Sequence, residues 1–192
     1  LMKALYEREI TGKGGRIDIS MFESSVSWLT VPITLTGSFG RKVTRRGNTH
    51  EFFCPVSVFK TRNGFVYFAV GNDRQWKSLV SIGAFKGLDR PEYEKNHGRI
   101  RDVANLNRAI DEITAALSSE ELIERFKAAT IPISRIHPVE EVIADPLVQR
   151  RILFAADPKT GMRITLAPPP IMTPFLEASG RCLSFPPRFG EH

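Results

Sequence analysis

The sequence contains few cysteines and no long apolar segment. Two of its 192 residues are cysteine, Cys54 and Cys182, and they lie far apart without a CxxC pair. This spacing favours neither a disulfide framework nor a zinc site, and it is typical of free thiols in a reducing compartment. The longest apolar runs, such as residues 65–70, are much shorter than the roughly 20 residues that a membrane helix needs. We therefore expect no metal site, no membrane association and a cytoplasmic location.

Motifs that identify a reaction are also missing. The four histidines are dispersed without an HExxH pattern, there is no GxSxG, and the segment TGKGG lacks the spacing of a phosphate-binding P-loop. Asp18 follows this glycine turn in an expected strand, where an aspartate is more often structural. His50 differs because it lies beside Asn48 in a long glycine-bearing connection, where polar side chains often face ligands. These residue patterns by themselves name no reaction.

The charge is moderately basic and evenly spread. Lys and Arg number 27 against 21 Asp and Glu, which gives a formal net charge of +6. Such an excess suits a phosphorylated ligand, but nucleic-acid binders usually carry a basic stripe with interleaved aromatic residues, and none is present. With 42% hydrophobic and 25% charged residues, the chain has the composition of a soluble globular protein. We expect no nucleic-acid partner.

Hydrophobic periodicity predicts alternating helices and short strands. The first helix ends at a glycine turn, Asn63-Gly64 is a hairpin signal, and Ser118 with Glu121 forms a capping box. A proline-rich tail after residue 167 is expected to be extended and largely unpaired. Pro32 is expected to kink or end the second of the predicted helices. The predicted helices cover residues 1–8, 21–35, 73–82, 106–117, 119–126 and 139–144, and the predicted strands cover residues 16–20, 56–59, 65–69, 131–136, 153–156 and 162–166.

Three segments together resemble one enzyme family. EREITGKGGRIDISMFE, RRGNTHEFFCPVSVFKTRNGFVYFAVGNDRQW and PPRFGEH, in this order, are closely similar to the class III CoA-transferases, the CaiB/BaiF family. The resemblance covers all 192 residues but corresponds to only part of a full family member. It implies that the N-terminal part with the catalytic aspartate and the C-terminal end are absent from this sequence.

The resemblance also implies a fold. Family members form an interlocked dimer in which each chain has a Rossmann-like α/β large domain and an α+β small domain. By this comparison, residues 1–53 are the end of the first large-domain segment and a linker, and residues 54–151 are the α+β small domain. Residues 152–192 are the return linker toward the large domain. The chain would then be a small domain flanked by segments of the large domain.

The activity that the resemblance implies is transfer of CoA from an acyl-CoA thioester to a carboxylic acid, through an aspartyl mixed anhydride and thioester. CoA thioester is the substrate, and no covalently bound cofactor is expected. The nucleophilic aspartate is expected upstream of Leu1, so we assign no catalytic residue and expect this chain alone to be inactive. Met21 matches a position that contacts CoA. Gly47, Asn48 and His50 match a linker loop near the active site, in a form similar to members that act on dicarboxylic substrates.

Two alternatives remain open from the sequence. One is an enzyme like α-methylacyl-CoA racemase, which uses the same fold to abstract a proton, with bases that would also lie upstream. The other is a non-catalytic fragment that binds CoA or self-associates.

Overall fold

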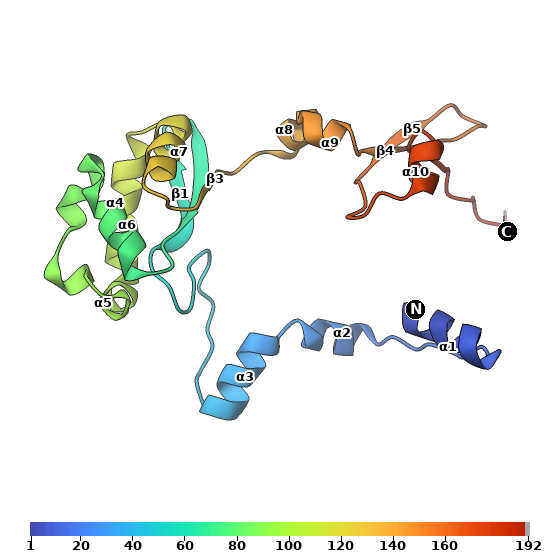
Figure 1. Cartoon of the computed structure of the whole chain (residues 1–192), viewed down its shortest axis with the longest axis horizontal. Coiled ribbons are helices and arrows are strands. Elements are labelled where there is room, and N and C mark those ends of the chain that lie inside the picture. Colours follow the sequence, from blue (N-terminus) through green and yellow to red (C-terminus); the bar gives the residue numbers. More distant parts are fainter. Residues whose placement is uncertain (191–192) are drawn as a thin grey trace. The chain divides into compact units, whose positions relative to one another are not determined.

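A division between Gly47 and Asn48 separates two compact units in the computed structural model, which describes residues 1–190 (Figure 1). The first unit comprises Leu1–Gly47, and the second begins at Asn48. The domain boundaries expected after residues 53 and 151 concern the family fold as a whole and stay predictions.

The first unit consists of three helices, α1 (Met2–Thr11), α2 (Met21–Ser27) and α3 (Thr30–Phe39). The predicted first helix is confirmed, and it ends at Gly12, which adopts φ 68° and donates its N–H to the Arg8 carbonyl at 2.8 Å. A left-handed residue of this kind is a common helix terminus, and glycine takes the conformation without steric cost. None of the residues in these three helices is buried.

Two predictions for this unit were wrong. Residues 16–20 form no strand, because no strand of the described chain pairs with them, and Ile19 is 77% exposed. An extended segment without a ladder partner leaves its backbone groups to solvent. The helix expected over residues 21–35 is divided at Trp28 and Leu29 into α2 and α3. Pro32 lies in the first turn of α3, where its missing N–H costs no helical hydrogen bond.

An antiparallel sheet begins the second unit, with the strand order β1 (Val56–Thr61), β2 (Gly64–Ala69) and β3 (Ile133–Arg135). The predicted hairpin is confirmed: Thr61 pairs with Gly64, whose φ of 147° is easy only for glycine. The free edge of β1 is covered by a helix, since Lys60 donates its backbone N–H to Asp111 and accepts a bond from Thr114. This pairing protects the edge from other strands.

Helices cover one face of this sheet (Figure 1). The predicted capping box is confirmed, because Ser118 and Glu121 bond reciprocally, and Asn72 caps another helix by accepting from the Gln75 N–H at 2.9 Å. A stretch that the sequence left without structure contains two 3-10 helices and one α-helix. The elements are α4 (Asp73–Ser81), η1 (Gly83–Leu88), η2 (Pro91–Tyr93), α5 (Asn96–Arg101), α6 (Val103–Ala115) and α7 (Ser119–Ala128).

Aromatic side chains form the centre of this α+β core. Phe68 stacks on Phe59 at 4.4 Å between ring centroids and meets Phe126 edge-on at 4.8 Å. Alternate residues of β2 face opposite ways: Phe68 is fully buried, whereas Phe65 and Tyr67 on the outer face are 49% and 40% exposed. An antiparallel sheet with helices on one face is an α+β arrangement.

The C-terminal part holds a second small sheet. Short helices α8 (Val139–Ala144) and α9 (Pro146–Gln149) lead to β4 (Leu153–Ala156) and β5 (Arg163–Leu166), which agree with the two predicted strands and pair antiparallel. The tail prediction was wrong, because α10 (Pro174–Ala178) and β6 (Cys182–Ser184) interrupt it, and β6 pairs in parallel with the free edge of β4. The last two residues of the PPRFGEH segment lie outside the described residues.

Candidate functional site

The four residues expected to contact ligand are divided between the two units. Met21 and Gly47 belong to the first unit, and Asn48 and His50 belong to the second. Met21 is the first residue of α2, and the side chain of Ser20 caps this helix by accepting from the Glu23 N–H at 3.2 Å. The Met21 side chain is 87% exposed. A well-capped helix start therefore presents an apolar, accessible thioether.

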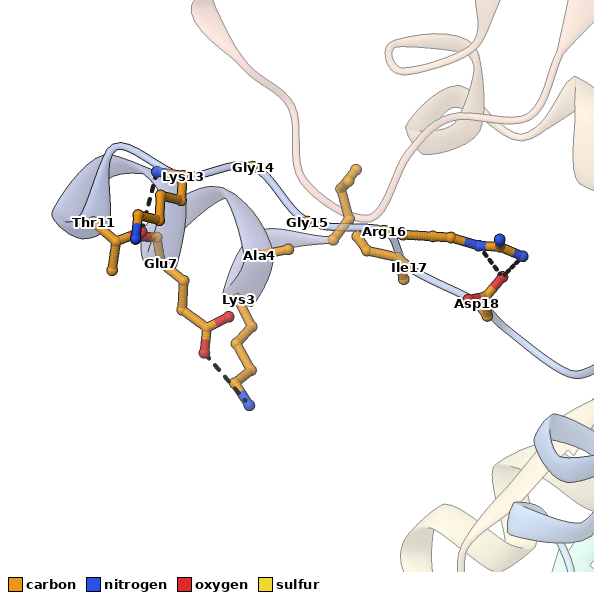
Figure 2. A pocket seen from close by; sticks show the side chains of 11 residues that line it. Lys3, Ala4, Glu7, Thr11, Lys13, Gly14, Gly15, Arg16, Ile17 and Asp18 are labelled. Carbon is orange, nitrogen blue, oxygen red and sulfur yellow. Dashed lines mark hydrogen bonds and ion pairs between the residues drawn. The ribbon is translucent and has the colours of Figure 1, made fainter.

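The first unit also contains an open hollow of about 720 Å³ between α1 and the loop over residues 13–18 (Figure 2). None of the predicted ligand residues lines it. Asp18 lies here with a largely exposed carboxylate, and the guanidinium of Arg16 binds it at 2.7 Å. Both side chains are largely exposed, so this is a surface ion pair of small energy.

The linker enters the second unit through Gly47 and Asn48. Gly47 has a φ of 59°, a left-handed turn that favours glycine. Asn48 lines a hollow of about 500 Å³ at the outer face of the β1–β2 hairpin. The other lining residues come from β1, β2 and α6, and they are Val58, Lys60, Phe65, Asp111, Glu112 and Ala115. Asn48 thus has polar and aromatic neighbours beside an open surface.

The His50 ring is held by its two aromatic neighbours. The backbone N–H of Phe52 donates to His50 Nδ1 at 3.1 Å, and the imidazole stacks on the Phe53 ring at 5.1 Å with an interplanar angle of 25°. In a neutral imidazole, a nitrogen that accepts a hydrogen bond leaves the proton on the other nitrogen. Since the side chain is exposed, Nε2–H of His50 is the donor that a ligand can reach.

Three side chains that the sequence left unassigned fix the end of this linker. Asn96 donates to the Phe52 carbonyl at 2.7 Å and accepts from the Cys54 N–H at 3.1 Å. Arg99, fully buried, donates to the Cys54 carbonyl at 2.7 Å and to Asp73 at 2.8 Å. Asp73 also accepts the Asn96 backbone N–H at 3.0 Å. Their separation in the sequence, 42 residues from Asn96 to Cys54, gave no local signal of this contact.

Ionisation states follow from these contacts. The hydrogen bond from Arg99, more than any other contact, holds the pKa of Asp73 below its usual range. Burial raises the pKa of the Cys54 thiol to about 12, which outweighs the lowering effect of the nearby guanidinium. A thiol of that pKa carries almost no thiolate at neutral pH, and thiolate is the nucleophilic form. Cys54 is therefore a packing residue and not a nucleophile.

A buried carboxylate, that of Asp157, lies in the C-terminal part. Asp157 accepts from the Thr160 hydroxyl at 2.5 Å, the Lys159 N–H at 2.9 Å and the Arg188 guanidinium at 2.8 Å. Led by the Thr160 bond, these donors lower the pKa of Asp157 to about 2. A carboxylate engaged by three donors stabilises its turn and is a poor proton acceptor.

Within residues 1–190, the structure contains no cluster of three or more His, Cys, Asp or Glu side chains that could hold a metal ion. The same residues include no helix that is long and apolar enough to cross a bilayer.

Known proteins resemble this chain along its length. An acetyl-CoA:oxalate CoA-transferase of Acetobacter aceti is 28% identical over 152 residues, which are 79% of this chain and 39% of that enzyme. A succinate–glutarate CoA-transferase of Agrobacterium fabrum is 27% identical over 201 aligned positions, which cover all of this chain and 48% of that enzyme. The chain thus spans half or less of the length of these relatives.

Solved structures agree with the sequence comparisons. A CaiB/BaiF family protein from Brucella suis aligns with a TM-score of 0.72 at 25% identity, covering 90% of this chain and 45% of that protein. Rv3272 of Mycobacterium tuberculosis aligns with a TM-score of 0.68 at 16% identity over the same share of this chain, which shows likeness of fold. The sequence model of CoA-transferase family III matches residues 1–192. The chain belongs to CoA-transferase family III.

Proposed function

We propose that the protein containing this chain transfers CoA from an acyl-CoA thioester to a carboxylic acid acceptor. The observation that carries the proposal is the match of the family III model to all 192 residues. The relatives named as acting on succinate, glutarate and oxalate support it further. The same proposal includes CoA thioester as the substrate, no covalently held cofactor and a cytoplasmic location.

The chemistry requires a nucleophilic carboxylate. An aspartate attacks the acyl carbonyl, CoA leaves as thiolate, and a mixed anhydride forms; thiolate then attacks the anhydride to give an aspartyl thioester and the released acid. The acceptor carboxylate next attacks the aspartyl thioester, which releases CoA thiolate and forms a second mixed anhydride. CoA thiolate then attacks the acceptor carbonyl, which gives the new CoA ester and frees the aspartate. We place this aspartate upstream of Leu1. We do not assign this role to Asp18, because by the family resemblance it matches the segment after the glycine turn, where the residue is not the nucleophile. We accordingly expect residues 1–192 alone to show no turnover.

The proposed substrate contacts are Met21 with CoA, and Gly47, Asn48 and His50 with the acyl group or the acceptor. An Nε2–H donor on an exposed His50 fits an anionic or carbonyl oxygen. Asn48 offers an amide at a hollow that Lys60 lines together with Asp111 and Glu112, so the charge of this hollow does not itself select a dicarboxylic substrate.

The proposal also includes the interlocked dimer and the Rossmann-like large domain of the family. Support comes from the first unit, where apolar side chains lack cover: Trp28 is 88% exposed, and Phe22 and Ile19 are each 77% exposed. Several large apolar side chains exposed within one short segment are consistent with a surface that another part of the protein covers.

The test uses the complete protein with succinyl-CoA and a panel of dicarboxylic acids. We expect the CoA ester of an acceptor to appear, and no product with residues 1–192 alone. Replacement of His50 by Ala removes a donor to a charged oxygen and should lower transfer by about tenfold or more. His50→Gln, whose amide reaches a similar distance, should retain more activity. Formation of no new CoA ester with any acceptor would reject the transferase proposal.

A further inference from the structure

Asn96 links the start of α5 to the linker that carries His50. Its side-chain amide uses both ends: Nδ2 donates to the Phe52 carbonyl at 2.7 Å, and Oδ1 accepts from the Cys54 N–H at 3.1 Å. The two bonds need opposite ends of the amide, so a flipped side chain would lose both. Asn96 therefore fixes one orientation of the segment from Phe52 to Cys54.

A partly buried network centred on Arg99 holds Asn96 in turn. Its backbone N–H donates to Asp73 Oδ1 at 3.0 Å, and the same oxygen accepts from Arg99 Nη2 at 2.8 Å. Arg99 is fully buried, lies over the Trp76 ring at 5.0 Å, and bonds the Cys54 carbonyl through Nε at 2.7 Å. Charge-assisted bonds of this kind are short and directional, and a buried group has little freedom to rearrange. The hydrophobic core thus extends rigid support to the linker.

The two groups that hold the His50 ring both belong to the segment from Phe52 to Cys54, which Asn96 binds. The N–H that binds His50 Nδ1 comes from Phe52, whose carbonyl Asn96 binds, and the ring that stacks on the imidazole comes from Phe53. Phe53 lies between two residues whose backbone groups Asn96 binds. Loss of the Asn96 bonds would loosen both supports together, with Arg99 still holding the Cys54 carbonyl at the end of the segment.

We infer that Asn96 is a positioning residue, which acts through Phe52 and Phe53 to keep the proton of a neutral His50 on Nε2 and to aim that donor at a substrate oxygen. The inference rests on the proposed role of His50 in substrate contact. A fixed donor needs no reorientation when an anionic substrate binds, and such preorganisation improves binding without any new contact. The substrate oxygen that accepts this hydrogen bond belongs to the carboxylate of the acceptor or of the acyl group.

The test replaces Asn96 with Asp in the complete protein. Aspartate has nearly the same shape and keeps an acceptor for the Cys54 N–H, but it loses the donor to the Phe52 carbonyl. Asn96→Ala removes both bonds, and Asn105→Ala is the matched control, because Asn105 is exposed and its amide bonds only Asp102. If the alanine variant fails to fold, the near-isosteric aspartate variant still gives the answer.

Two measurements read the outcome. Nitrogen NMR of 15N-histidine-labelled protein should show one His50 tautomer, protonated at Nε2, in the parent and in Asn105→Ala, and a mixture of tautomers in Asn96→Asp. The KM for the acceptor should rise by about tenfold while kcat changes less, since a positioned donor is lost. A single unchanged tautomer together with an unchanged KM in Asn96→Asp would overturn the inference. If the tautomer changes but His50→Ala transfers CoA normally, the positioning stands and the proposed role of His50 fails.

Discussion

Replacement of Arg99 by Ala is the most informative perturbation of the second unit. The guanidinium is completely buried, and it donates to the carbonyl oxygens of Cys54, Tyr93 and Glu94 at 2.7, 2.8 and 3.0 Å. It also binds the Asp73 carboxylate at 2.8 Å. Alanine supplies none of these donors, so the variant leaves three acceptors and one carboxylate without their partner.

The expected loss of stability in Arg99→Ala is large compared with the whole free energy of unfolding of a domain. A buried acceptor left without a partner costs about 1–3 kcal/mol, and removal of one member of a buried ion pair costs about 3–5 kcal/mol. The Asp73 side chain is 36% exposed, so water replaces part of what the carboxylate loses. These terms overlap, and we expect a total of about 4–6 kcal/mol. Domains of this kind are stable by only about 5–15 kcal/mol, so Arg99→Ala should be barely folded.

Urea unfolding followed by tryptophan fluorescence measures this loss. Trp76 is 1% exposed and lies against Arg99, whereas Trp28 is already 88% exposed, so the signal change comes mainly from Trp76. The control is Arg62→Ala, which removes an exposed ion pair with Glu121 at 3.4 Å and should leave the urea midpoint unchanged. A loss below about 1 kcal/mol for Arg99→Ala would refute the reasoning, because it would mean that water satisfies the acceptors as well as the guanidinium does.

Three further predictions concern single residues. A thiol reagent at neutral pH should modify Cys182, which is exposed, and spare Cys54 until the protein unfolds, because the pKa of Cys54 is raised to about 12; equal reaction rates would contradict this. Gly98→Ala should unfold at clearly lower temperature than Gly87→Ala, since a Cβ at position 98 collides with a backbone carbonyl and one at position 87 meets open space; equal midpoints in thermal scans would count against this packing. The carboxyl carbon signal of Asp157 should titrate at about pH 2 by NMR. Because this pKa lies below the unfolded value of 3.8, the stabilisation by the ionised carboxylate is complete above about pH 4 and is lost as the pH falls toward 2. Titration near pH 4 would show that the three donors are absent.

Local patterns predicted the parts of the fold that local interactions determine. The capping box at Ser118 and the Asn63-Gly64 hairpin were found because their partners are within three residues. Residues 16–20 alternate like a strand, but a strand forms only beside a partner, and the described chain offers none. The same limit applies to the tail, where β6 forms because the edge of β4 is available to it.

The sequence predicted some residues of the candidate site and missed others. Asn48 and His50 were proposed from their place in a glycine-bearing linker and from the family resemblance, and their contact with substrate stays a prediction. Asn96 and Arg99 were missed because a short polar helix gives no sign of which distant backbone its side chains bind, and the bonds to Cys54 span more than 40 residues. A single arginine among polar residues usually indicates a solvated surface, whereas Arg99 is completely buried.

The central proposal is tested most directly by incubating the complete protein with succinyl-CoA and glutarate in heavy water and then recording the mass spectrum of the CoA esters. Transfer predicts a new ester with the mass of glutaryl-CoA and no deuterium on the carbon next to the thioester in either product. A spectrum that lacks the new ester but shows succinyl-CoA one mass unit heavier would contradict the account and indicate proton exchange of the racemase kind.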